Sequence, residues 1–331
     1  MMPPDDILAA LRRMGLLDGR TPGEPLTGGV SSDIWRIDLA SGPICVKRAL
    51  GKLRVAMDWH APVTRNLYEA RWIRRAGEAV PGAVPRLLGQ DSESGALAMT
   101  YLDPTRHPLW KTLLREGRAD PDFAASVATA LVRIHAATAA RPALAHEFAT
   151  DEIFHAIRLE PYLLATARAH PDLARRLEAL ASTTAHTKLA LVHGDVSPKN
   201  ILAGPQGPIF LDAECAWWGD PGFDLAFCLN HLLLKCLWIP DARTGFLKCF
   251  DRLAATYLAG VVWEAPATIE ARAAHLLPGL FLARVDGKSP VEYLTAEHDK
   301  ARVRRTARGL LASPVDRLSS VREAWREELA R

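Results

Sequence analysis

The sequence predicts an α+β protein, with a small antiparallel sheet and one inserted helix followed by a mainly helical region. Short apolar runs separated by Gly/Pro turns, the pattern of strands, fall in the first third of the chain apart from one later hairpin. From Pro121 onward, apolar residues recur at three- and four-residue spacing, which indicates amphipathic helices. The pattern changes near Asp103, so we expect a first lobe over residues 1–102 and a second over residues 103–331.

The N-terminal region is predicted to begin with a short helix over residues 5–14, which Gly15 ends. Strands are expected over residues 34–39 and 44–47, because both runs have strand character and a Ser-Gly-Pro turn separates them. A helix beginning near Pro62 would follow.

Two further strands, over residues 84–88 and 96–102, would complete the sheet. In the helical region, the spacing of apolar residues over 123–134 predicts an amphipathic helix. Residues 225–237 are apolar on nearly every face, which predicts a buried helix.

The composition is that of an ordinary globular protein: 331 residues, 24% of them charged, with a formal net charge of +3. A charge this small does not demand a nucleic acid or an anionic membrane as partner. No apolar stretch approaches the length of a membrane span. The five scattered cysteines form no CxxC pair, which is typical of buried thiols in a reducing compartment. We therefore expect a cytoplasmic protein.

The later hairpin carries a cluster of polar residues. An apolar run ends in a His-Gly-Asp sequence at Asp195, and Asn200 begins two short apolar runs around a Gly-Pro-Gln-Gly-Pro turn. If Ala203 pairs with Ile209, Asn200 faces Asp212 at the open end of the hairpin. Amide and carboxylate oxygens with a nearby carboxylate suit Mg²⁺ and phosphate chemistry.

This arrangement resembles the catalytic loop and metal-binding Asp of the protein-kinase-like fold. It is most similar to the small-molecule branch: aminoglycoside phosphotransferases, choline kinases and methylthioribose kinase. The Gly-Asp-Pro-Gly-Phe-Asp sequence at 219–224 also resembles that branch, and Gly194 stands where protein kinases have Arg. The resemblance implies a two-lobed kinase-like fold, ATP and Mg²⁺ as cofactors, and transfer of the γ-phosphate to a hydroxyl of a small molecule.

The resemblance also implies roles for the residues of this loop. Asp195 would accept or orient the hydroxyl proton of the acceptor, and Asn200 and Asp212 would bind Mg²⁺. His193 and Asp224 would be structural, with Asp224 capping backbone N–H groups of the loop. The alternative is that these are ordinary turn residues, because Asp and Asn are common at hairpin ends.

Nucleotide binding is implied for two further parts of the chain. Lys47 would hold the α- and β-phosphates, and Glu69 on the next predicted helix would form an ion pair with it. A lone lysine at a strand end is otherwise usually solvated, and Glu78 is a competing partner near the helix end. The other implied nucleotide-binding residues lie in a glycine loop over ATP and at the hinge between the lobes: Gly28, Gly29, Ser31, Met99 and Tyr101.

Residues that concern the metal or the acceptor follow the hairpin. Glu214 completes an Asp-x-Glu pair similar to that of methylthioribose kinase, where both carboxylates lie at the metal; a role outside the metal shell stays open. Trp217 and Trp218 come next, while Arg284 and Lys288 lie in a turn after an apolar helix. Together they suit a pocket for a sugar or an anionic acceptor, although basic loop residues are often simply solvated.

A kinase of a small hydroxylated metabolite is the favoured function. Only seven residues separate Asp212 from Asp220, which leaves no room for the peptide platform of protein kinases. An aminoglycoside or choline phosphotransferase is the alternative, disfavoured by the basic acceptor loops. A nucleotide-binding pseudokinase scaffold is the alternative of another class, but the residue types it would have lost are present.

Lys199, inside the loop that follows Asp195, either contacts the γ-phosphate or points to solvent.

Overall fold

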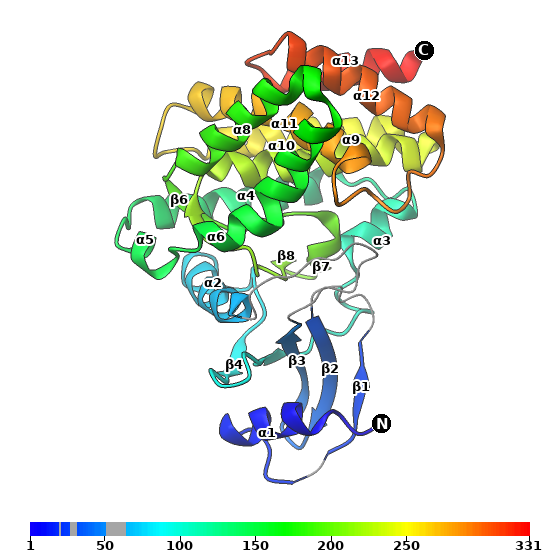
Figure 1. Ribbon diagram of the computed structural model, residues 1–331. Helices are drawn as coiled ribbons and strands as arrows, with labels where there is room; N and C mark the ends of the chain where they lie inside the picture. Colours follow the sequence, from blue (N-terminus) through cyan, green and yellow to red (C-terminus); the bar gives the residue numbers. More distant parts are fainter. Residues whose placement is uncertain (20, 27–31, 51–63) are drawn as a thin grey trace.

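The N-terminal part of the chain forms a five-stranded antiparallel sheet in the order β1-β2-β3-β5-β4 (Figure 1). The computed structural model describes residues 1–19, 21–26, 32–50 and 64–331. The strands are β1 (Gly23–Pro25), β2 (Ser32–Leu39), β3 (Gly42–Ala49), β4 (Leu87–Gln90) and β5 (Leu97–Thr100).

Helix α1 (Asp5–Arg13) covers the face of the sheet that lies away from the helical region (Figure 1). Its apolar side, including Leu11, packs with Trp35 and Val46 in a small core separate from the main one. Alternating burial along β2 follows from the two-residue period of a strand, which sends every second side chain into this core.

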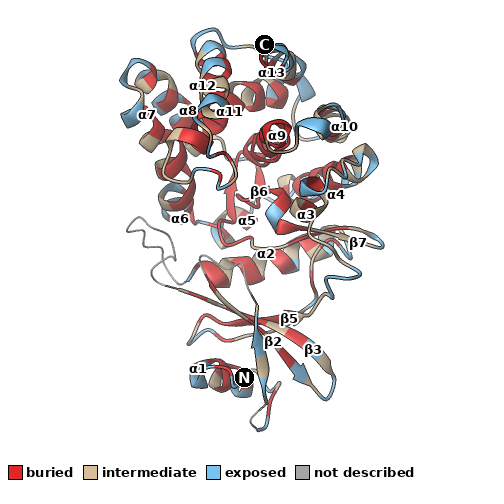
Figure 2. Cartoon of the chain, turned by 90° about the vertical axis from the view of Figure 1, so that its right-hand side faces the viewer, coloured by how far each residue is buried: buried red, intermediate tan, exposed pale blue. Residues whose placement is uncertain are grey.

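Helix α2 (Arg65–Ala79) lies between the sheet and the helical region (Figures 1 and 2). Trp72 and Ile73 on α2 join the main core, which the helical region supplies. The helix therefore links the two parts of the molecule and carries Glu69 toward the sheet.

The helical region is built around α9 (Pro221–Trp238), nearly all of whose residues are buried (Figure 2). This burial confirms the prediction made for residues 225–237. A π-helical segment, His155–Leu164, joins α6 to α7. The other helices are α3 (Trp110–Arg115), α4 (Pro121–Ala139), α5 (Leu144–Glu147), α6 (Asp151–Phe154), α7 (Ala165–Ala169), α8 (Ala174–His186), α10 (Arg243–Ala259), α11 (Pro266–Asp286), α12 (Glu297–Ala312) and α13 (Leu318–Ala330).

Two short antiparallel pairs lie between the sheet and the helices. They are β6 (Ala190–Val192) with β9 (Trp217–Gly219), and β7 (Ile201–Gly204) with β8 (Gly207–Phe210).

The register predicted for the β7–β8 hairpin is wrong by one residue. Ala203 pairs with Pro208 and not with Ile209. The reason is the turn: Gly207 adopts a φ of 127°, which only glycine tolerates easily, so the strands pair right up to a two-residue turn instead of a five-residue one.

The predicted fold class is confirmed, and the expected strands and helices are present within a few residues of their predicted limits. Helix α2 begins at Arg65, and Pro62, where we expected it to begin, lies outside the described residues. Across the described ranges, no helix has the length and apolar character needed to cross a membrane.

Candidate active site

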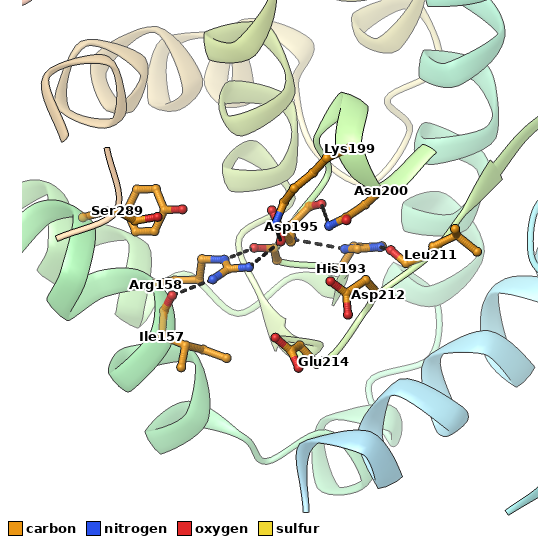
Figure 3. A network of polar contacts seen from close by, with 12 residues as sticks. Ile157, Arg158, His193, Asp195, Lys199, Asn200, Leu211, Asp212, Glu214 and Ser289 are labelled. Atoms are coloured by element: carbon orange, nitrogen blue, oxygen red, sulfur yellow. Dashed lines mark hydrogen bonds and ion pairs between the residues drawn. The ribbon is translucent and has the colours of Figure 1, made fainter. Parts of the chain in front are cut away.

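The loop between β6 and β7 holds the central aspartate of the predicted site (Figure 3). Its bend depends on Gly194, whose φ is 81°. A Cβ added there would lie 2.7 Å from Cys215 Cβ and 2.8 Å from the Cys215 carbonyl oxygen, so no side chain fits without moving the backbone. This crowding explains locally why a glycine precedes Asp195.

Asp224, near the start of α9, holds the backbone of this loop in place. Its Oδ2 accepts a hydrogen bond from the His193 backbone N–H, and its Oδ1 accepts one from the Gly194 N–H, both at 2.8 Å. The ring of His135 lies 3.2 Å from the same carboxylate. All these groups are buried, so each bond is strengthened by the low local dielectric. Asp224 therefore fixes the loop backbone.

His193 braces the other side of the loop. Its Nδ1 accepts from the Asp195 N–H at 3.1 Å, while its Nε2 lies 3.1 Å from the Leu211 carbonyl oxygen. Burial lowers the pKa of His193, so the ring is neutral and its single proton sits on Nε2. The ring also packs edge-on against Trp72 at 4.7 Å. His193 thus ties the loop to the strand that leads into Asp212.

Asp195 is 4% exposed, and its carboxylate lies between two cations (Figure 3). Its Oδ2 is 2.9 Å from Arg158 and 3.1 Å from Lys199. Burial alone would raise the pKa of Asp195, but Lys199 and Arg158 outweigh it and hold the pKa well below its ordinary value. Asp195 is therefore an ionised carboxylate with a fixed orientation.

No sequence pattern predicted a role for Arg158. It lies on the π-helical segment, a kind of helix that often marks functional sites. Besides Asp195, it donates to the carbonyl oxygens of Gly194 and Ile157. The available signal was an arginine flanked by Ile157 and Leu159 in an apolar stretch, because a charge on a buried face needs a partner.

Asn200 and Asp212 lie at the open end of the hairpin, beside Asp195 (Figure 3). The Asn200 Nδ2 donates to the Asp195 carbonyl oxygen at 3.1 Å, so the amide oxygen remains available to another group. Asp212 adopts a left-handed backbone with a φ of 66°, which carries it out of the β8 ladder. An amide oxygen and a carboxylate are the kind of ligand that Mg²⁺ takes, so this pair fits the cation implied by the resemblance.

Lys47 on β3 contacts carboxylates from two other elements. Its Nζ is 2.7 Å from Glu69 Oε2 on α2 and also bonds Asp212 Oδ1. Burial would lower the pKa of Lys47, but Asp212 and Glu69 outweigh it and raise the pKa, so the ammonium stays charged. Glu78, the competing partner, is exposed and pairs with Arg75 at 3.2 Å.

Glu214 is engaged by an arginine. Its Oε2 accepts from Arg65 Nε at 2.8 Å, and both side chains are buried. Within the part of the chain that the structure describes, no three His, Cys, Asp or Glu side chains gather as a metal site. A cation near Asp212 would therefore need oxygens from Asn200 or from phosphate, and metal binding by Glu214 stays a prediction.

Trp217 and Trp218 lie in β9, inside the main core, with 1% and 7% of their surface exposed. Trp217 stacks on Phe154, with ring centroids 4.0 Å apart. Core packing therefore takes up both rings, and the structure does not support the expectation that they face an acceptor. Tryptophans that follow a loop motif can instead belong to a strand that packs into the core.

The two basic residues expected near the acceptor differ in their surroundings. Lys288 forms an ion pair with Glu160 at 2.9 Å and lies partly exposed. Arg284 is buried, bonds Tyr162 and Ser289, and lines a pocket that also touches Lys199. Only Arg284 of this pair thus borders a cavity next to the Asp195 loop.

The structure says less about the remaining nucleotide-binding residues. Met99 is buried in β5, and Tyr101 is half-buried just after it, with the Arg36 guanidinium 4.9 Å from its ring centroid. Their predicted contact with the adenine stays a prediction. Three predicted residues lie outside the described ranges: Gly28, Gly29 and Ser31.

The architecture is a protein-kinase-like fold. The chain is similar to amicoumacin kinase hAmiN, solved with AMP-PNP, Ca²⁺ and Ami (TM-score 0.58, 14% identity, 95% of each chain covered). It is also similar to a choline/ethanolamine kinase family protein from Mesorhizobium loti (TM-score 0.52, 16% identity, 98% of each chain covered). At these identities the likeness shows the fold alone.

The chain belongs to the phosphotransferase enzyme family, whose model matches residues 22–252. This match confirms the predicted resemblance and the predicted enzyme class. Methylthioribose kinase 1 of Oryza sativa subsp. japonica is 24% identical over 253 residues, which cover 68% of this chain and 58% of the relative. The chain thus spans about three fifths of the length of the curated relatives it matches.

Proposed function

We propose that this chain is an ATP-dependent kinase that transfers the γ-phosphate to a hydroxyl group of a small metabolite. One observation carries the proposal: Lys47, Glu69 and Asp212 converge from three elements beside the ionised, oriented carboxylate of Asp195. A cation for phosphates, oxygen ligands for a metal and an oriented carboxylate are what phosphoryl transfer requires. The family match and the AMP-PNP held by the similar amicoumacin kinase support the same conclusion.

The nucleotide would lie between the sheet and the Asp195 loop. Lys47 would hold its phosphates, kept in place by the ion pair with Glu69. Asn200 and Asp212 would hold Mg²⁺, which, when bound, neutralises charge on the phosphates. Asp212 would then exchange its bond to Lys47 for the cation, and Lys47 would turn toward the phosphate oxygens.

The main role of Asp195 would be to position the acceptor hydroxyl, and removal of the hydroxyl proton early in the transfer would be a smaller contribution. Its pKa is held well below the ordinary value, which makes it a weak base. Arg158 fixes the carboxylate orientation by contacting both Asp195 and the Gly194 carbonyl. Because the transition state of phosphoryl transfer is loose, alignment of the hydroxyl is the larger contribution.

ADP release from Mg·ATP with a panel of sugars, amino alcohols and aminoglycosides tests this proposal. At least one acceptor should be phosphorylated, and Asp195→Asn should lower kcat by about 10²–10⁴-fold while AMP-PNP binding persists. Asp151→Asn, at a surface aspartate paired with Lys188, is the matched control and should retain full activity. Undiminished transfer by Asp195→Asn would refute its role. Nucleotide binding without transfer to any acceptor would favour a scaffold.

A further inference from the structure

A small, partly open pocket lies against the Asp195 loop. Lys199 borders it and also contacts Asp195 at 3.1 Å, so the pocket adjoins the proposed transfer site. Its cavity volume is about 20 Å³, room for one water-sized group such as a single oxygen of a ligand, and it opens to solvent. The polar residues that line it are Lys111, Lys199, His231, Lys235, Arg284 and Glu292.

The cations of this pocket are not all balanced by the chain. Lys111 pairs with Glu292, and Lys199 pairs with Asp195. In the described ranges, neither Lys235 nor Arg284 has a carboxylate within ion-pair distance. Two buried basic side chains therefore face the cavity without a counter-charge, so a positive charge on either is costly unless another molecule supplies an anion.

Lys235 on α9 is the more unusual of the two. It is 1% exposed, and its Nζ lies 3.9 Å from the ring centroids of both Trp238 and Tyr293. The rings stack on each other at 4.4 Å and hold the side chain against the pocket wall. Aromatic faces compensate an ammonium only in part. Burial accordingly lowers the pKa of Lys235 to about 6.

Two buried nitrogens at the same pocket lack a hydrogen-bond partner. They are His231 Nε2 and Arg284 Nε, on side chains that are 6% and 8% exposed. Buried polar groups without partners are rare in folded proteins, and each requires an explanation. Around a pocket lined by cations, a bound ligand with acceptor oxygens is the simplest one.

We infer that the acceptor carries an anionic group, a carboxylate or a phosphate, which Lys235 and Arg284 bind while its hydroxyl faces Asp195. The inference rests on the proposed kinase function and names its substrate class. In the transfer, the hydroxyl oxygen bonds to the γ-phosphorus, the bond from that phosphorus to the β-phosphate oxygen breaks, ADP leaves and the hydroxyl proton passes to water. The anionic group only anchors the molecule.

Calorimetric binding of matched probes to the chain loaded with Mg²⁺ and AMP-PNP tests this inference. The pairs are D-glycerate with glycerol, D-gluconate with D-glucose, and D-ribose 5-phosphate with D-ribose, and they separate carboxylate from phosphate recognition. At least one anion should bind more than about 30-fold tighter than its neutral partner, and Lys235→Met should remove that advantage. Lys188→Met, at a lysine that also lies 3.9 Å from a tryptophan ring, is the control outside the pocket.

The outcomes separate the inference from the function on which it rests. Binding of none of the anions, tighter binding of a neutral probe, or an anion affinity that Lys235→Met leaves unchanged overturns the inference. ADP release with neutral or cationic acceptors would then still uphold the kinase. Conversely, anions that bind through Lys235 but are never phosphorylated would leave the pocket assignment standing and count against the kinase.

Discussion

The two sides of Asp195 differ in how their cations are compensated. On the side of the sheet, Lys47 lies against two carboxylates of the chain itself, Glu69 and Asp212. On the side of α9, Lys235 lies against aromatic rings, with no described carboxylate in ion-pair distance. Both lysines are buried. Asp212 and Glu69 raise the pKa of Lys47 despite its burial, whereas burial lowers the pKa of Lys235.

This difference shows that the buried lysine on the sheet side has its charge partners within the chain, whereas the lysine on the α9 side does not. A charge paired inside the chain is stabilised before any ligand arrives, whereas an unpaired buried amine either loses its proton or weakens the fold until an anion compensates the charge. The same substitution made on each side should therefore have opposite consequences for stability.

Lys47→Met should have the largest effect. It leaves Glu69 and Asp212 buried without their cation, so the free energy of unfolding should fall by about 3–5 kcal/mol. Lys235→Met replaces a buried amine that has no carboxylate partner by an apolar side chain, and it should leave stability unchanged or increase it. Urea denaturation of both variants beside the parent protein measures the contrast. A Lys235→Met loss as large as that of Lys47→Met would contradict the difference between the two sides.

Asp224→Asn tests the loop that both sides share. The amide offers one acceptor oxygen where the carboxylate offers two, so one backbone N–H of His193 or Gly194 loses its partner. The free energy of unfolding should fall by about 1.5–3 kcal/mol, and kcat should fall with it because Asp195 shifts. Denaturation and ADP release are the two measurements.

Asp120→Asn provides a matched control for that variant. Asp120 also accepts from two backbone N–H groups, at the N-terminus of α4, but on the surface. Asparagine caps helices nearly as well as aspartate, so both stability and kcat should stay near the parent values. A similar loss in the two variants would show that the loop has no special dependence on Asp224.

The sheet side of the site was predictable because its residues are spaced by regular elements. The strand ending at Lys47 and the helix carrying Glu69 could be identified from apolar periodicity, and the structure joins the two side chains at 2.7 Å. The hairpin register was predicted wrongly, since it depends on the φ of a single glycine, Gly207. Local backbone freedom of this kind leaves no apolar pattern to detect.

The α9 side could not be predicted in the same way. Lys235 belongs to a helix that is apolar on nearly every face, so its sequence indicates burial and gives no sign of a cavity. Arg158 reaches Asp195 from a segment far along the chain, through a π-helical turn that no sequence pattern announced. Trp217 and Trp218, expected near the acceptor, lie in β9, which pairs with β6 inside the main core, and no sequence pattern indicated this strand.

Proton uptake on anion binding is the smallest expected effect, and it tests the protonation state of Lys235 on the α9 side. The pKa of Lys235 in the ligand-free chain is about 6, so at pH 7.5 most of its amines are uncharged. A bound anion favours the ammonium and raises this pKa, so binding should take up roughly one proton at pH 7.5 and less as the pH approaches 6, where Lys235 is already half protonated. Charged or titratable groups that face Lys235 are Lys111, His231, Arg284, Glu292 and Tyr293.

Calorimetry in two buffers of different ionisation enthalpy counts this proton. Burial also lowers the pKa of His231, so that ring is the competing proton acceptor at the pocket. Lys235→Met separates the two, because uptake that persists in this variant belongs to His231. Binding of the anion without any proton uptake would mean that Lys235 keeps its charge in the empty pocket, and that the aromatic pair compensates it as fully as the carboxylates compensate Lys47.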